Sequence, residues 1–238
     1  MKEFLKRLIK LSPIPLSKNH KYDIQTKKII SRLGDDFNSI DVGCHKGEIM
    51  DLLLESSPKG IHFGIEALPN MFENLTLKYQ ETSNCTILNF AASNETKEIE
   101  FNHVITNPAY SGMLKRDYDR PDEKDVVIKV QSKKLDDQIP SEIKIDLIKI
   151  DVEGAELQVL EGSKNLIKKS KPIVIFEHGL GASDHYGTTP EKLFQFFDNQ
   201  EMRISNLGGY LKNGNYLSLK EFKRQYDEKE NYYFIAHS

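Results

Sequence analysis

Two groups of residues in this sequence have the types and the spacing to do chemistry. The first is the run Asp41-Val42-Gly43-Cys44-His45-Lys46-Gly47, which has the pattern acid-x-Gly-x-x-x-Gly. Glycines at a strand-to-helix turn let the backbone approach a ligand and let the helix begin tightly against the strand. This run lacks the Gly-x-Gly-x-x-Gly of dinucleotide-binding turns, and Asp41 would repel a phosphate. The turn therefore favours a ligand that carries positive charge.

Glu66 is the second acid of this group, and it ends the apolar run Ile61-His62-Phe63-Gly64-Ile65. An acid roughly 20 residues beyond a glycine turn holds a ribose, because each hydroxyl can donate to one carboxylate oxygen. S-adenosylmethionine (SAM) joins a ribose to a sulfonium and an amino group, so it suits both acids. The cofactor-binding residues predicted here are Asp41, Gly43, Cys44 through its backbone, Gly47, Glu66 and Ala67.

Each of these features also has a plain structural explanation. A turn without a ligand would use the same glycines, and a solvated glutamate is common at the end of a strand. The coincidence of the Asp41 turn with Glu66 favours the SAM site. Ala91 and Ala92, in the next apolar run, are expected to flank the adenine. Ordinary strand packing explains those two alanines nearly as well.

The second group contains three acids within six residues, Asp151, Glu153 and Glu156, directly after the apolar run at 147–150. Acids in the first turn of a helix favour its dipole and cap exposed N–H groups, which explains Glu153 and Glu156 without chemistry. Asp151 is different, because a carboxylate at the end of a buried strand costs desolvation energy unless a partner compensates it. We therefore expect Asp151 to serve both cofactor binding and catalysis.

A further pair, Glu177-His178, follows the apolar run at 173–176. If SAM passes its methyl group to a hydroxyl, the acceptor oxygen must be held in line with the methyl group and a further group must remove the hydroxyl proton. We predict His178 as that base because histidine titrates near neutral pH. Asp151, Glu153 and Glu177 could instead gather a Mg²⁺-like ion. Sequence spacing alone does not show that these three converge, so base catalysis is favoured and the predicted catalytic residues are His178, Asp151, Glu177 and Glu153.

The elements that must position these residues alternate between apolar strands and amphipathic helices. This order predicts an α/β fold whose mostly parallel sheet has helices on both faces and holds ligands at the carboxyl ends of its strands. Strands are predicted over 39–43, 61–66, 86–92, 145–150, 172–176, 202–207 and 232–236, and helices over 22–33, 48–55, 70–79, 155–168 and 190–199.

We divide the chain into an N-terminal helical segment, residues 1–38, that packs on the domain, and the domain itself, residues 39–238. Residues 1–11 form a basic amphipathic pattern, which suits an anionic membrane surface but is more simply explained by packing on the domain. A surface insert at about 101–134 breaks the strand–helix rhythm. Aromatic and basic residues in it, such as Tyr110, Arg116 and Tyr118, would suit a sugar or an anionic acceptor. A merely solvated charged loop is the stronger alternative for each of them.

Several of these motifs, in this order, resemble the FkbM family of SAM-dependent methyltransferases. Lys149-Ile150-Asp151-Val152-Glu153-Gly154-Ala155-Glu156 is similar to the family's most recognisable motif, and Leu135-Asp136-Asp137 to the segment before it. Ile40-Asp41-Val42-Gly43 with Gly47, then Glu66, and then Asn89-Phe90-Ala91-Ala92-Ser93 resemble its earlier motifs. Cys44-His45 departs from the family pattern.

The resemblance implies a Rossmann-like class I methyltransferase fold with seven strands, the last antiparallel beside the fifth. It also implies O-methylation of sugars or hydroxylated small molecules, and so a place in glycan biosynthesis. The alternatives are a non-catalytic SAM-fold binding or scaffold protein, and a nicotinamide oxidoreductase. The missing Gly-x-Gly-x-x-Gly argues against the oxidoreductase.

The composition limits the classes of protein to which this chain can belong. The chain has 238 residues, 38% hydrophobic and 29% charged, and 33 Lys+Arg against 36 Asp+Glu give a formal net charge of -3. A basic nucleic-acid-binding protein would show a positive excess, so we expect a small-molecule or sugar acceptor and no nucleic acid. Two cysteines cannot build a disulfide scaffold. No stretch approaches the roughly 20 apolar residues that a membrane-spanning helix needs. Residues 1–11 lack the pattern of a signal peptide. We expect a cytoplasmic protein whose oligomeric state is open.

Overall fold

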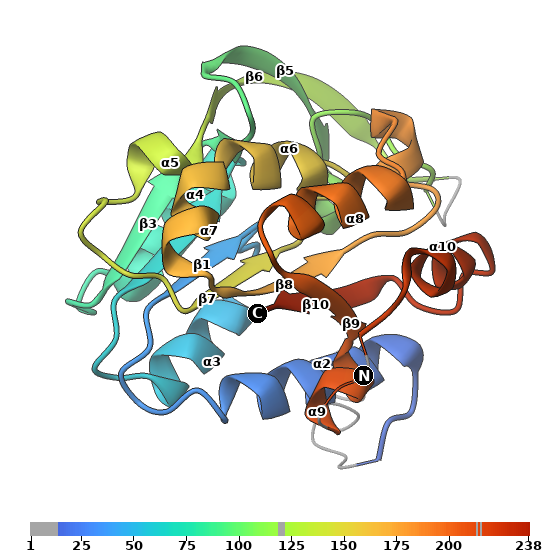
Figure 1. Cartoon of the computed structure of the whole chain (residues 1–238). Coiled ribbons are helices and arrows are strands. Elements are labelled where there is room, and N and C mark those ends of the chain that lie inside the picture. Colours follow the sequence, from blue (N-terminus) through green and yellow to red (C-terminus); the bar gives the residue numbers. More distant parts are fainter. Residues whose placement is uncertain (1–13, 119–121, 213, 215) are drawn as a thin grey trace.

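Seven strands form one sheet with the order β3-β2-β1-β7-β8-β10-β9, in which β10 runs antiparallel to both of its neighbours (Figure 1). The computed structural model describes residues 14–118, 122–212, 214 and 216–238, so the helix predicted for residues 1–11 lies outside the described part. The strands are β1 (Ser39–Val42), β2 (His62–Glu66), β3 (Cys85–Asn89), β7 (Leu147–Ile150), β8 (Ile173–Glu177), β9 (Arg203–Asn206) and β10 (Tyr233–His237). The predicted fold class, with its last strand antiparallel beside the fifth, is confirmed.

The strand order reverses beside β1. From β1 the chain builds outward through β2 to β3, and then returns to place β7 against the other edge of β1. The connections on the two sides of this point lead away from each other, which opens a crevice at the carboxyl ends of β1 and β7. Asp41 lies in β1 and the rest of its glycine run follows that strand, Glu66 ends the neighbouring β2, and Asp151 and Glu153 follow β7.

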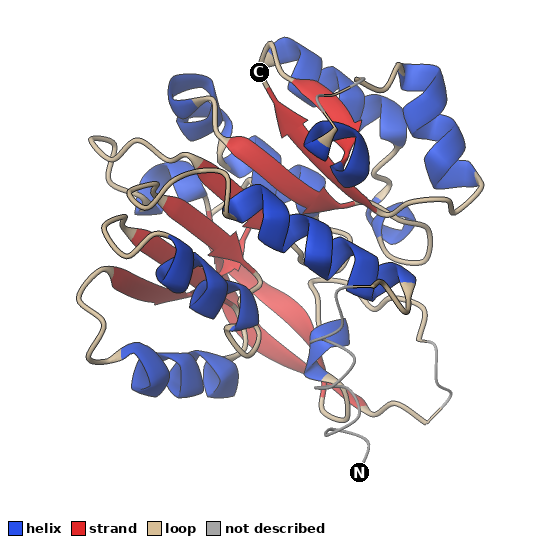
Figure 2. Ribbon diagram, turned by 90° about the horizontal axis from the view of Figure 1, so that it is seen from below, coloured by secondary structure: helices blue, strands red, loops and turns tan. Residues whose placement is uncertain are grey.

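Helices cover both faces of the sheet (Figures 1 and 2). Val159, Phe197 and Phe222 belong to the core under α6, α7, α8 and α10, whereas Ile29 and Leu53 belong to the core under α2, α3 and α9. The helices are α2 (Lys18–Ile30), α3 (Glu48–Ser56), α4 (Pro69–Tyr79), α5 (Leu135–Gln138), α6 (Glu156–Gly162), α7 (Lys164–Ser170), α8 (Pro190–Asn199), α9 (Leu207–Leu211) and α10 (Leu219–Asp227). None of the helices in the described residues is long and apolar enough to cross a membrane.

The helix predicted over 155–168 is two helices, α6 and α7. The hydroxyl of Ser163 lies 2.8 Å from the Val159 carbonyl oxygen and donates to it, which competes with the helical hydrogen-bond pattern at this position. The preceding Gly162 packs so closely on residue 93 that a Cβ there would lie 1.9 Å from the Ser93 carbonyl oxygen. The helix α10 was not predicted, although Ser218 and Glu221 form the capping box that marks its start.

The insert is a hairpin that stands apart from the main sheet (Figure 1). It consists of β5 (Lys97–Val104) and β6 (Asp125–Lys133), which pair antiparallel, and between them lies a short 3-10 helix, η1 (Pro108–Tyr110). The strand predicted over 86–92 divides, because β3 ends at Asn89 and β4 (Ala91–Ala92) leaves the main sheet to pair with β6. Inward side chains of the hairpin, including Phe101 and Val130, pack on Leu68 and Met71 and so fix it beside the crevice.

Candidate active site

A pocket of about 290 Å³ lies at the carboxyl ends of β1, β2 and β7, where the strand order reverses. Four acids line it from three different strand ends: Asp41, Glu66, Asp151 and Glu153. The hairpin and η1 add one wall, and α2 adds another through residues such as Tyr22 and Thr26. Of the predicted cofactor-binding residues, the pocket gathers Asp41, Gly43, Cys44, Glu66, Ala67, Ala91 and Asp151, whereas Gly47 lies behind it at the start of α3.

Asp41 is the most unusual of these acids. Its side chain is completely buried, and neither carboxylate oxygen has a hydrogen-bond partner among the described residues. Burial raises the pKa of Asp41, and the nearby charge of Lys149 and the neighbouring thiol of Cys44 oppose that shift only in part. A buried polar group without a partner costs free energy, so a native protein that keeps one at the wall of a pocket is equipped to satisfy it with a ligand.

Glu66 is held by the backbone on both of its oxygens. Its Oε2 accepts from the His45 N–H at 2.8 Å, and its Oε1 accepts from the Leu68 N–H at 2.9 Å. Burial raises the pKa of Glu66, and these two backbone hydrogen bonds lower it in part. Each carboxylate oxygen keeps a second lone pair. The carboxylate is therefore fixed in orientation while it can still accept two hydroxyl groups, as the sequence prediction of a ribose site requires.

Each glycine of the first turn has a packing role in the structure, beside the role predicted for it from the sequence. Gly43 has a φ of +85°, and a Cβ there would lie 2.0 Å from the carbonyl oxygen of Asp151. Gly47 has a φ of +76°, and a Cβ there would lie 2.4 Å from the Tyr79 hydroxyl. Gly43 thus allows the ends of β1 and β7 to approach each other, and Gly47 allows α4 to pack beneath the start of α3.

Lys149 and Asp151, in and directly after β7, form a polar chain with Tyr233 of β10. The ammonium of Lys149 donates to Asp151 Oδ2 at 2.8 Å, and the hydroxyl of Tyr233, from β10, donates to the same oxygen. Burial alone would raise the pKa of Asp151, but the charge and hydrogen bond of Lys149 outweigh it and hold that pKa at about 2. A carboxylate at the end of a buried strand was expected to need a partner. For Asp151 that partner is Lys149, two residues earlier on the same face of the strand.

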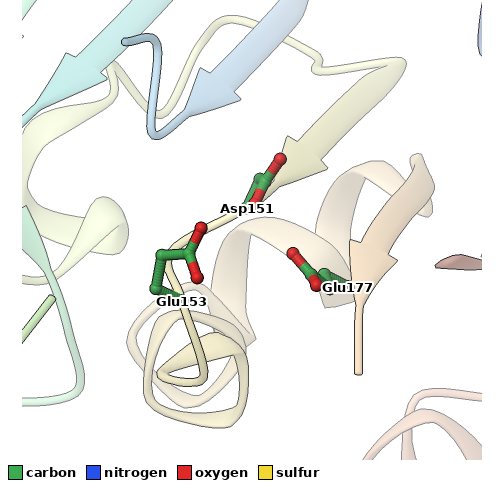
Figure 3. Close-up of side chains that lie close together, drawn as sticks. All are labelled: Asp151, Glu153 and Glu177. Atoms are coloured by element: carbon green, nitrogen blue, oxygen red, sulfur yellow. The ribbon is translucent and has the colours of Figure 1, made fainter. Parts of the chain in front are cut away.

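The carboxyl groups of Asp151, Glu153 and Glu177 converge, as Figure 3 shows. One oxygen of each lies within 4.8 Å of the others, although the three residues follow two different strands. Glu153 has a φ of +58°, and it also pairs with the guanidinium of Arg116, which comes from the insert. Burial and the neighbouring charge of Asp151 raise the pKa of Glu177 well above its usual range. The raised pKa of Glu177 favours its protonated form in the hydrogen bond that it shares with Asp151.

His178 does not lie where a general base is needed. Its side chain is fully buried, its ring stacks on Tyr226 of α10 at 4.3 Å, and it does not line the pocket. Burial lowers the pKa of His178 to about 3. Neither ring nitrogen has a hydrogen-bond partner among the described residues. A base must come within hydrogen-bond reach of the acceptor hydroxyl, so the expectation that His178 sits at the mouth of the site is corrected.

Two residues with clear roles at the site were not predicted as site residues. The sequence analysis explained Glu156 only as a helix-capping acid and did not consider Tyr233. Glu156 is fully buried, and its Oε1 accepts from the N–H groups of Val152 and Gly154 at 3.2 and 3.1 Å. It thereby fixes the turn that presents Glu153, as the capping explanation predicted in part. Tyr233 reaches the site because β10 inserts between β8 and β9, and only the topology could have indicated this.

The strand order, the antiparallel β10 and the acid-lined pocket beside β1 define a class I SAM-dependent methyltransferase fold. Within that class the chain belongs to the FkbM methyltransferase family, because the family model described as "Methyltransferase FkbM domain" matches residues 41–204. None of the curated proteins matches the chain.

A solved structure from the same family has a similar fold. The FkbM methyltransferase from Methylobacillus flagellatus superposes with a TM-score of 0.54 at 15% identity, covering 94% of this chain. The match covers 51% of that protein, so the present chain spans about half of its length. A SAM-dependent methyltransferase from Aquifex aeolicus has a TM-score of 0.45 at 12% identity, with 100% of this chain and 97% of the other covered. Aeropyrum pernix fibrillarin with bound SAM has a TM-score of 0.45 at 10% identity, with 90% and 73% covered.

Proposed function

We propose that this chain is a SAM-dependent O-methyltransferase that acts on a hydroxyl group of a sugar, a glycan precursor or a hydroxylated small molecule. The observation that carries the proposal is Asp41, a fully buried carboxylate without a hydrogen-bond partner among the described residues, in the same pocket as Glu66. One acid suits the positively charged end of SAM, and the other suits its ribose. Membership of the FkbM methyltransferase family supports the same cofactor.

The other residues of the pocket fit this cofactor as well. Glu66 has two oxygens already oriented by backbone N–H groups, which leaves one lone pair on each for a ribose hydroxyl. Ala91 and Ala92 are small, buried and part of the pocket lining, which suits a flat ring against the backbone. When bound, SAM supplies an activated methyl group, so the protein needs only to orient the acceptor and to take its proton.

We assign the proton of the acceptor hydroxyl to Glu153. Asp151 Oδ2 already accepts hydrogen bonds from Lys149 and Tyr233, and burial with the charge of Asp151 raises the pKa of Glu177 well above its usual range, which favours its protonated form. His178 is buried away from the pocket. Glu153 lines the pocket and gives one oxygen to Arg116, so its other oxygen is left to accept the hydroxyl proton. Asp151 and Glu177 then orient the acceptor beside it.

The acceptor class follows from the wall that the insert provides. Pro108, Ala109, Ser111 and Met113 line the pocket, and beside them the rings of Tyr110 and Tyr118 stack at 6.2 Å with an angle of 8° between their planes. Apolar and aromatic surfaces of this kind suit the face of a sugar ring. A net charge of -3 and the acidic pocket favour such an acceptor over a nucleic acid.

Cofactor binding is the first test. SAM and S-adenosylhomocysteine should each raise the melting temperature of the wild type, because a ligand that binds only the folded state stabilises it. Asp41→Asn and Glu66→Gln should each reduce that rise, while Glu73→Gln, an exposed acid on α4, should leave it unchanged. If neither ligand shifts the melting temperature of the wild type, the proposed function is wrong.

Turnover is the second test, and it separates an enzyme from a non-catalytic SAM-binding protein. Wild-type protein, SAM and a panel of sugar nucleotides, glycan precursors and hydroxylated small molecules should give a product heavier by one methylene group, as detected by mass spectrometry. Glu153→Gln should abolish that product yet keep the SAM-induced rise in melting temperature. A protein that binds SAM but methylates no member of the panel would support the scaffold alternative.

A further inference from the structure

The segment of the insert over residues 112–118 crosses the acceptor side of the site and docks on both loops that present the carboxyl groups. The Leu114 N–H donates to the Tyr186 hydroxyl at 2.7 Å, and the Asp117 N–H donates to the Gly181 carbonyl at 3.2 Å. Both acceptors belong to the loop that follows β8. The insert is therefore fastened to the part of the chain that directly follows Glu177.

Arg116 is the cationic residue by which this segment contacts the carboxyl groups. Its guanidinium pairs with Glu153, and the two side chains are only 16% and 14% exposed. It also lies 4.8 Å from the centre of the Tyr110 ring, which stacks on Tyr118. The Tyr118 hydroxyl in turn accepts from Asn102 of β5 at 2.7 Å. A stacked, paired and largely buried guanidinium has one defined position, unlike the solvated charge expected of a surface loop.

The cluster beside Arg116 has the composition of a divalent-cation site. Three carboxyl groups, those of Asp151, Glu153 and Glu177, converge within 4.8 Å, and hard cations prefer such oxygen ligands. Two fixed positive charges already occupy its surroundings, since Lys149 donates to Asp151 and Arg116 pairs with Glu153. A divalent ion entering this space would have to displace Arg116 from Glu153 and approach the ammonium of Lys149.

We propose that Arg116 occupies the cation position of this three-carboxyl cluster and is the positioning residue that holds Glu153 toward the acceptor, so that the site needs no divalent metal. The role of Glu153 as base rests on the proposed function. The occupation of the cation position by Arg116 does not rest on the proposed function. This occupation can be measured on the protein without any acceptor.

Binding of Mn²⁺, followed by electron paramagnetic resonance of the free ion, tests the cation position. We expect no binding to the wild type up to ~1 mM, and Arg116→Met should bind Mn²⁺ at least ~10-fold more tightly, because removal of the guanidinium opens the oxygen ligands. Arg116→Lys keeps the charge and should behave as the wild type. Arg116→Met combined with Glu153→Gln should lose the gained site. Tight Mn²⁺ binding by the wild type, or none by Arg116→Met, would overturn the proposal.

Kinetics with an acceptor found in the turnover screen test the positioning role. Wild-type turnover should be the same in EDTA and in Mg²⁺. Arg116→Met should raise KM for the acceptor and lower kcat, with Arg116→Lys restoring part of both, while SAM affinity stays unchanged because Arg116 is not among the residues that line the cofactor pocket. Loss of wild-type turnover in EDTA would overturn this role. Loss of SAM binding in the wild type would instead refute the proposed function and leave the Mn²⁺ result intact.

Discussion

Asp41 of β1 and Lys149 of β7 are register partners in adjacent parallel strands, and both are buried beneath the pocket. The Lys149 ammonium donates a hydrogen bond to Asp151 and does not donate one to Asp41. Its charge therefore reduces the cost of burying Asp41, although neither oxygen of that acid has a hydrogen-bond partner among the described residues. The charge of one lysine thus stabilises two acids, which explains how the Asp41 carboxylate persists in the folded protein.

Removal of the shared cation should destabilise the protein in a way that depends on Asp41. Lys149→Met should lower the free energy of unfolding by about 3 to 5 kcal/mol, because it removes the cation from the buried Asp41 and the partly buried Asp151. Asp41→Asn in the Lys149→Met background should restore part of that loss, which urea unfolding of the two single variants and the double variant would measure. Lys78→Met, which breaks an exposed ion pair with Asp51, should cost less than about 1 kcal/mol. Strict additivity of the two buried substitutions would contradict the shared-cation explanation.

Close approach of β1 and β7 should make Gly43 intolerant of any side chain. Gly43→Ala should lower the free energy of unfolding by about 3 kcal/mol or more, because the new Cβ both adopts a positive φ and meets the Asp151 carbonyl oxygen. Gly187→Ala is the matched control, since Gly187 also has a positive φ but has nothing within 4 Å of the added Cβ. It should cost about 1 to 2 kcal/mol. Equal losses in urea unfolding would mean that backbone strain alone explains Gly43.

The sequence was sufficient for the fold and for bringing Asp41, Glu66 and Asp151 to one pocket, because those features are local. Asp41 and Glu66 each end a short apolar strand, and parallel strands bring their carboxyl ends to one edge, so their proximity follows from order along the chain. Asp151 follows by the same rule. The contacts that complete the acceptor side depend on topology instead. Arg116 meets Glu153 only because the hairpin folds back over the crevice, a placement that no local pattern encodes.

The misplaced base has a simple geometric origin. Successive residues at the end of a strand point to opposite faces of the sheet. Glu177 faces Asp151, so His178 must face the helices, and it stacks there on Tyr226 of α10. The sequence placed both residues at the strand end correctly but did not show which of them faces the Asp151 carboxylate. The same alternation puts Lys149 and Asp151 on one side of β7, a pairing that the sequence contains.

Glu156 should make stability depend on pH near neutrality. Its burial raises its pKa from 4.5 to about 7, so the folded state binds a proton more tightly than the unfolded chain. The contribution of Glu156 to the free energy of unfolding is therefore complete below about pH 4.5. This contribution, about 3 kcal/mol, is lost as the pH rises toward 7. Glu156→Gln keeps an oxygen for the Val152 and Gly154 N–H groups and should flatten the pH dependence of urea unfolding between pH 5 and 8. Glu73→Gln should not flatten it, and an unchanged slope in Glu156→Gln would contradict this assignment.

His178 should prove dispensable for methyl transfer and harmful to stability in acid. Its pKa falls from 6.5 to about 3 on burial, so protonation opposes folding, and stability is lost as the pH falls from about 6.5 toward 3. By pH 4.5 that loss amounts to about 3 kcal/mol in the wild type. His178→Leu should match the wild type within about 1 kcal/mol at pH 7, exceed it in urea unfolding at pH 4.5, and retain both SAM binding and turnover. His103→Leu, at a partly exposed position in β5, should show no such gain in acid. If His178→Leu binds SAM normally but no longer transfers the methyl group, the histidine is the base after all and the assignment to Glu153 is wrong.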